Sequence, residues 1–134
     1  KGAKDTIDRI IDVFPSEQQA QVRTMLAGSL QAVISQMLLP KARGKGRVCA
    51  TEIMIVSYGI RNLIRENKVF QIPSLMQASA ATGMMTLASC LLALTQRGEI
   101  TRASAIEAAG DPDLFSNVED TSERSTGSRR PARR

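Results

Sequence analysis

Two neighbouring stretches of this chain have the composition and spacing of β-strands, and the rest of its apolar sequence reads as helix. The two stretches are residues 30–39 and 47–56, and the polar, glycine-bearing link 41–46 between them predicts a β-hairpin. Two strands rarely form a stable sheet alone in water. We therefore expect the hairpin to belong to a larger sheet, whose other strands lie in an upstream α/β core.

The residues before the hairpin have the apolar spacing of two helices. Residues 4–14 carry an apolar stripe that predicts a first helix, which Pro15 should end. Ser16 and Gln19 have the spacing of a capping box, so we expect them to begin a second helix that ends near Gly28.

Four short helices are expected after the hairpin, with Ser57 and Thr101 as caps of the first and the last. They span residues 58–66, 74–81, 84–97 and 102–109. Residues 116–134 are rich in serine, glycine and arginine and nearly devoid of apolar side chains, which predicts a disordered basic tail. The predicted organisation is a core part over 1–57, a helical bundle over 58–115 and the tail.

The amino-acid composition limits the kinds of catalytic and metal site that this chain can form. The chain has no histidine among its 134 residues, which excludes Ser-His and Cys-His catalysis and most zinc sites. Its two cysteines, Cys49 and Cys90, are far apart among apolar neighbours, and we expect buried, reduced thiols. We predict no catalytic residue and no metal site in this chain. The net charge of +5 owes much to the arginines of the tail, so we expect no specific nucleic-acid partner.

Three features have simple structural interpretations. Gly44–Gly46 reads GKG, which lacks the spacing of a phosphate-binding loop and is interpreted as a turn. Glu52 lies among apolar residues of the second strand, and we expect an ion pair with Arg47. Asp5, Asp8 and Asp12 form an acidic face of the first helix, which is interpreted as a solvated surface.

One eight-residue segment carries a more specific signal. It reads GIRNLIRE, and its members are Gly59, Ile60, Arg61, Asn62, Leu63, Ile64, Arg65 and Glu66. The apolar three, Ile60, Leu63 and Ile64, have the spacing of a buried helix face. The polar four could contact a partner or solvent.

This segment closely resembles the AIRNLIRE helix of twitching-motility, PilT-like ATPases that retract type IV pili. Further similar segments occur in the same order: TIDRIIDVFP at 6–15, QQAQVR at 18–23, LLPK at 38–41, GKGRV at 44–48 and RGEIT at 97–101. The resemblance covers residues 1 to about 115. Gly59 departs from the alanine that is common in the family.

The resemblance implies a mainly helical α/β fragment: the end of a RecA-like P-loop core, formed by two helices and the hairpin, followed by the bundle. The Walker A and Walker B motifs would lie upstream of Lys1, which is not a start methionine, so we expect the fragment alone to be inactive. Arg9 would lie near the edge of the nucleotide pocket, and the GIRNLIRE helix would act in retraction.

For the parent protein, the resemblance implies a cytoplasmic homo-hexamer, peripheral to the inner membrane, that uses ATP and Mg²⁺ and contacts the membrane platform protein of the pilus. Two alternatives remain open at this point. One is a pilus assembly or type II secretion ATPase, which shares the fold but usually lacks this helix. The other is a stand-alone helical interaction module.

Overall fold

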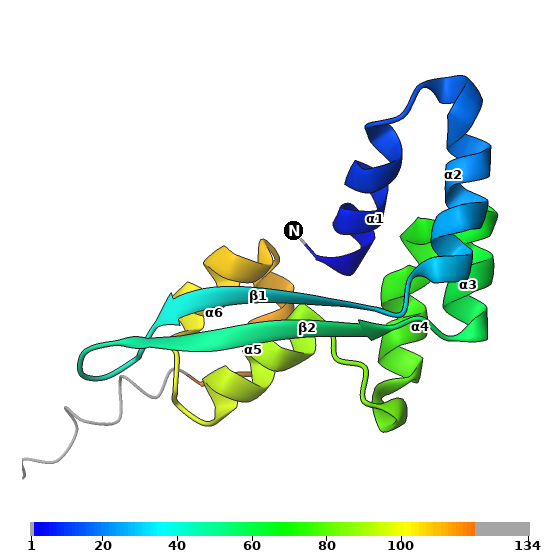
Figure 1. Ribbon diagram of the computed structural model, residues 1–134. Coiled ribbons are helices and arrows are strands. Elements are labelled where there is room, and N and C mark those ends of the chain that lie inside the picture. Colours follow the sequence, from blue (N-terminus) through cyan, green and yellow to red (C-terminus); the bar gives the residue numbers. More distant parts are fainter. Residues whose placement is uncertain (1, 120–134) are drawn as a thin grey trace, which may run out of the picture. The chain divides into compact units, whose positions relative to one another are not determined.

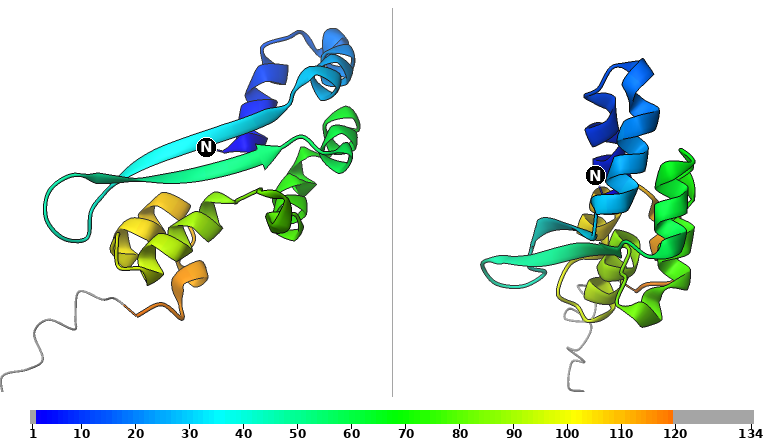
Figure 2. Two further views of the ribbon diagram at one scale, coloured as in Figure 1. Left: turned by 60° about the horizontal axis from the view of Figure 1, so that its bottom comes forward. Right: turned by 45° about the vertical axis from the view of Figure 1, so that its right-hand side comes forward.

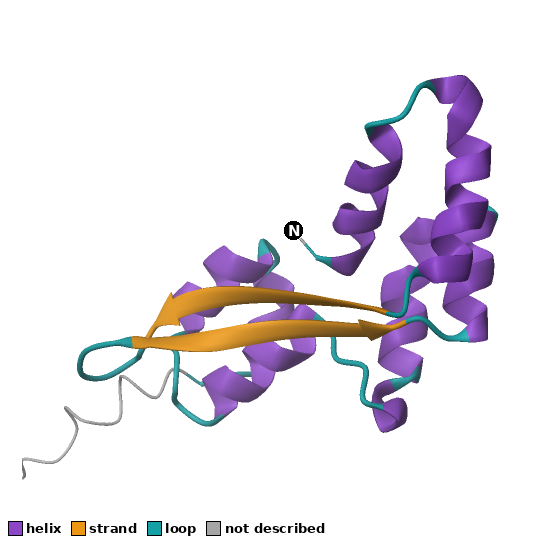
Figure 3. Ribbon diagram, viewed as in Figure 1, coloured by secondary structure: helices purple, strands orange, loops and turns teal. Residues whose placement is uncertain are grey.

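The computed structural model describes residues 2–119, and within them the chain is mainly helical and contains one β-hairpin (Figure 1; Figure 3). The elements are α1 (Ala3–Asp12), α2 (Ser16–Ser29), β1 (Ala32–Pro40), β2 (Arg47–Ile55), α3 (Tyr58–Arg65), α4 (Ile72–Ala78), α5 (Leu87–Gln96) and α6 (Arg102–Ala109). This order confirms the predicted fold class. Among these residues no helix combines the length and apolar character that crossing a membrane requires. The predicted tail lies, from residue 120 onward, outside the described residues.

The start of α2 differs from the prediction. Ser16 is the first helical residue, and the capping position before it is occupied by Pro15, whose backbone is extended. A capping side chain must come from that preceding residue, so Ser16 cannot fill the role and the predicted capping box is wrong. Gln19 instead donates a side-chain hydrogen bond to the carbonyl oxygen of Phe14 (3.0 Å).

The register of the hairpin is the same at its two ends. The N–H of Val56 donates to the carbonyl oxygen of Gln31, and the N–H of Lys41 donates to that of Gly46. Both pairs fit the same pairing of the strands, so the register does not shift between the two ends. Because side chains alternate across a strand, β1 presents one half-buried face and one exposed face. Ile53 of β2 also exchanges two backbone hydrogen bonds with Met85, which forms one isolated antiparallel bridge outside the two strands.

The chain divides into two compact units, and each has its own core. The first unit contains residues up to Met37 together with Thr51–Leu87, and the second contains Leu38–Ala50 and the residues from Ala88 onward. The predicted domain limits at residues 57 and 115 stay predictions.

In the first unit α2 packs against both α1 and α3. Their buried residues form one apolar cluster with side chains from β2 and the residue after it, from α4 and the short turn before it, and from the segment before α5. The cluster comprises Ala3, Ile7, Ile11, Ala27, Met54, Val56, Ile60, Ile64, Val69, Ile72, Met76 and Met84. This cluster fixes the position of α3, which carries the GIRNLIRE segment.

In the second unit Thr101 caps α6 by accepting a hydrogen bond from the N–H of Ser104 (3.1 Å), as predicted. Phe115 is fully buried here, and its carbonyl oxygen accepts a hydrogen bond from Arg102 (2.9 Å). Cys90 is buried, but Cys49 is exposed, which corrects the prediction for that thiol. The reason is strand alternation: Cys49 lies on the opposite face of β2 from buried Ala50.

Candidate functional site

The GIRNLIRE segment forms α3, which starts as predicted. Ser57 caps the helix by accepting a hydrogen bond from the N–H of Ile60 (3.4 Å). Ile60 and Ile64 are fully buried, and Leu63 is half-buried against the same cluster. The apolar half of the segment therefore anchors α3 in the core of the first unit, as its spacing predicted.

Gly59 lets α4 come close to α3. A Cβ atom at this position would lie 3.0 Å from Cδ2 of Leu75, which is tighter than an ordinary side-chain contact. An open groove runs between the two helices, lined by Gly59, Leu63, Gln71, Ser74, Leu75 and Ala78. The departure of this position from alanine thus has a packing consequence that the sequence alone does not reveal.

The side chain of Arg61 contacts another helix of the same chain. Its Nη1 donates a hydrogen bond to the carbonyl oxygen of Ala27, in the last turn of α2. The last carbonyl groups of a helix carry partial negative charge, so a guanidinium is favourable there. Arg61 therefore joins α2 to α3. In this it differs from the other three polar residues of the segment, with which it was grouped from the sequence.

The remaining polar residues of the segment interact locally. Arg65 is exposed and its Nη1 donates to Oδ1 of half-buried Asn62 (3.0 Å). Glu66 is exposed and its carboxylate lies 3.2 Å from Nζ of Lys68. Surface pairs of this kind contribute little to stability. Asn62, Arg65 and Glu66 are therefore the polar motif residues that lie outside the core and form only local pairs.

Arg61→Ala should lower the free energy of unfolding by about 1–2 kcal/mol, because a charge-assisted hydrogen bond at a half-buried helix end is lost. Arg65→Ala should change it by less than about 0.5 kcal/mol, because that side chain is exposed. Urea unfolding of the two single variants measures the difference. Equal effects would contradict the separate roles of these two arginines.

Arg9 lies elsewhere in the first unit. It is exposed in the last turn of α1, and among residues 2–119 it forms no hydrogen bond or ion pair with the GIRNLIRE segment. The nearby carboxylates of Asp5 and Asp8 both pair with Lys4, at 3.9 and 3.3 Å. The nucleotide-edge role of Arg9 stays a prediction.

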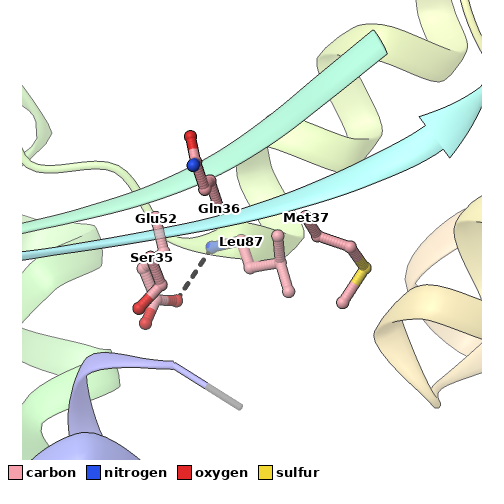
Figure 4. Close-up of a pocket in the computed structure, with 5 residues that line it drawn as sticks. All are labelled: Ser35, Gln36, Met37, Glu52 and Leu87. Carbon is pink, nitrogen blue, oxygen red and sulfur yellow. Dashed lines mark hydrogen bonds between the residues drawn. The ribbon is translucent and has the colours of Figure 1, made fainter. Parts of the chain in front are cut away.

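Glu52 is the site residue that sequence reasoning misassigned. Its Oε1 accepts a hydrogen bond from the N–H of Ala3 (2.7 Å), the first residue of α1. Its Oε2 accepts one from the N–H of Leu87 (2.9 Å), the first residue of α5 (Figure 4). The predicted ion pair with Arg47 is wrong, because residues five apart in a strand point to opposite faces.

The approach of α1 to Glu52 depends on Gly2. A Cβ atom there would lie closer to Oε1 of Glu52 than real Cβ atoms approach other atoms, so any side chain would displace the carboxylate. Helix N-termini carry unsatisfied N–H groups and partial positive charge, which a carboxylate satisfies well. We call this arrangement the Glu52 clamp. An acid on the half-buried face of a strand was its only signal in the sequence.

A small cavity lies beside the clamp, lined by Ser35, Gln36, Met37, Glu52 and Leu87 (Figure 4). Among the described residues no group of histidine, cysteine or acidic side chains is arranged to hold a metal ion. Gly44 and Gly46 lie in the hairpin link with positive φ, not at the start of a helix, in agreement with their interpretation as a turn. The contacts described in this subsection therefore fix the positions of helices.

Comparison with known proteins agrees with this arrangement. No protein-family model matches the chain. A type IV pilus retraction ATPase, PilT, from Pseudomonas aeruginosa is 53% identical over 113 residues, which cover 84% of this chain and 33% of that protein. A twitching motility protein from Neisseria gonorrhoeae is 46% identical over 115 residues, or 86% of this chain and 31% of that protein.

A solved structure shows the same fold. The crystal structure of the pilus retraction motor PilT with bound ADP superimposes with a TM-score of 0.73 at 49% identity, over 84% of this chain and 31% of that one. The chain thus spans about a third of the length of the curated relatives that it matches.

Proposed function

Because the chain matches the C-terminal part of PilT-like, type IV pilus retraction ATPases, we propose that it belongs to a hexameric motor in which ATP hydrolysis drives pilus retraction. The observation that carries this proposal is α3. Its sequence resembles the AIRNLIRE helix of the family, with Gly59 in place of alanine. Asn62, Arg65 and Glu66 lie outside the core, while Ile60 and Ile64 are buried in it.

In this proposal the described residues transmit movement and the nucleotide is bound elsewhere. ATP and Mg²⁺ would be held by P-loop residues of the parent protein, with Arg9 near the edge of that pocket. The first unit would carry a change at α1 to α3 through two contacts, the packing of α2 on α1 and the hydrogen bond from Arg61 to Ala27. The outward residues of α3 would then act on a neighbouring subunit or on the platform protein.

We also propose that the parent works on the cytoplasmic side of the inner membrane as a peripheral protein. Support comes from the names of the relatives, which are a pilus retraction ATPase and a twitching motility protein. A pilus retraction motor must act where pilin subunits leave the fibre.

A chimera tests the function directly. The matching third of the Pseudomonas relative is replaced by residues 2–119 of this chain, and the chimera is expressed in cells that lack their own retraction ATPase. We expect ATP hydrolysis and twitching motility. In the same chimera, Asn62→Ala with Arg65→Ala should abolish twitching while hydrolysis stays within about twofold, because these side chains lie outside the core.

The control in the chimera is Glu107→Ala, which removes an exposed charge of α6, outside the GIRNLIRE segment. It should leave twitching intact. Loss of hydrolysis in the double variant would mean that α3 serves the ATPase core and not the transmission of force. Twitching that survives the double variant would contradict the proposed role of the outward face.

A further inference from the structure

The link between β1 and β2 concentrates positive charge at the end of the hairpin. Lys41, Arg43, Lys45 and Arg47 alternate with small residues, and all four side chains are exposed. Gly44 and Gly46 have φ values of 75° and 101°, the left-handed conformation that lets the link turn sharply between its cations. We call residues 41–47 the basic loop, and Figure 2 shows it as an open curve at the end of the two strands.

The basic loop is held in place within the second unit, and three of its cations form no ion pair within the described residues. The N–H of Ala42 donates a hydrogen bond to the carbonyl oxygen of Glu99 (2.8 Å). The carboxylate of Glu99 pairs with Nε of Arg97 (3.4 Å), so that acid is matched by a cation of its own segment. Within the described part of the chain, Lys41, Lys45 and Arg47 form no ion pair.

A hollow lies at the base of the loop, lined by Lys41, Arg43, Val48, Gly98 and Glu99. Next to it the exposed face of the hairpin is partly apolar, because Leu38 is 59% exposed. The register places Pro40 opposite Arg47 on that same face. The loop therefore combines several unmatched cations with an exposed apolar side chain.

This combination fits a membrane surface better than a nucleic acid. Lysine and arginine near anionic headgroups each strengthen binding, and an adjacent apolar side chain can enter the interface. A surface for single-stranded nucleic acid typically offers aromatic side chains for stacking, and residues 38–50 and 97–100 contain none. We propose that the basic loop binds the phosphate-bearing headgroups of an anionic phospholipid membrane.

This inference rests on the loop itself and holds whether or not the chain is part of a retraction motor. Each cation removed should weaken binding about fivefold at physiological salt. The effect should shrink as salt is raised, because the screening length falls from about 10 Å at 0.1 M to about 3 Å at 1 M.

The test is co-sedimentation of the full chain with vesicles of phosphatidylcholine mixed with phosphatidylglycerol. Lys45→Ala with Arg47→Ala should weaken binding about 25-fold, and pure phosphatidylcholine vesicles should bind neither protein. The matched variant is Arg129→Ala with Arg130→Ala, which removes the same charge from the C-terminal segment and should weaken binding less than about fivefold. Thermal unfolding of both variants checks that they remain folded.

Three results would overturn the proposal. In the first, the Arg129/Arg130 variant loses as much binding as the loop variant, which would mean that net charge decides. In the second, inorganic phosphate displaces the chain from vesicles better than sodium chloride of equal ionic strength, which would mean a small-anion site in the hollow. In the third, the loop variant loses affinity for an oligonucleotide that the native chain binds more tightly than vesicles.

Discussion

Ile64→Ala should lower the free energy of unfolding of the chain by about 2–5 kcal/mol, the usual range for truncation of a large apolar side chain in a packed core. Ile64 is fully buried in the cluster of the first unit, where the neighbouring helices are held by the rest of the fold. The cavity left behind can close only in part. Urea unfolding, with the slope and the midpoint fitted separately, measures the effect.

The matched control for Ile64 is Tyr58→Ala in the same helix. Tyr58 is 80% exposed, so its truncation should change stability by less than about 0.5 kcal/mol. If the two variants were equally stable, the buried face of α3 would not be anchored as the structure has it. In the chimera, Ile64→Ala should reduce the amount of folded protein, whereas the outward variants should leave that amount unchanged.

Glu52→Ala should cost about 3 kcal/mol, because it removes the acceptors of two N–H groups at helix starts. Each hydrogen bond to a charged group contributes about 1.5–3 kcal/mol, and the half-buried position of Glu52 places the sum of the two at the lower end. Both the N–H of Ala3 and the N–H of Leu87 lose their partner. The measurement is again urea unfolding of the full chain.

Two further variants test whether the loss of stability comes from the two hydrogen bonds of Glu52 or only from the removal of a negative charge. Glu52→Gln keeps one acceptor oxygen and presents an NH₂ group to the other N–H, so it should lose at least half of the stability that the alanine variant loses. Glu107→Ala removes a carboxylate of α6 that lies outside the clamp and should change stability by less than about 0.5 kcal/mol. A glutamine variant as stable as the native chain would show that Glu52 does not clamp both helices.

Gly2→Ala provides a check from the other side of the clamp. The added Cβ would overlap Oε1 of Glu52, so it should weaken the hydrogen bond to Ala3. In a double-mutant cycle, Gly2→Ala should cost clearly less when Glu52 is already alanine. Independent effects would mean that the two residues do not act on each other.

Much of the fold could be predicted because it follows from local patterns. The cap formed by Ser57 and the alternation of the two strands each depend on residues close in sequence. The apolar stripe of the first helix is predicted from Ile7, Ile10, Ile11 and Phe14. Ile7 and Ile11 are buried, whereas Ile10 and Phe14 are exposed. Periods of 3.6 and 2 residues decide which side chains share a face, and they hold whatever packs against that face. The similarity of the GIRNLIRE segment to the AIRNLIRE helix is likewise a property of eight consecutive residues.

The sequence by itself determined the mainly helical class, the hairpin, the burial of Ile60 and Ile64, and the family. Only the tertiary structure decided the partners of Glu52 and Arg61. Glu52 binds the N–H of Ala3, forty-nine positions away, and Arg61 binds the carbonyl oxygen of Ala27, thirty-four positions away. Sequence patterns carry no information about which backbone groups a distant side chain will meet, because that depends on how the helices and the hairpin pack.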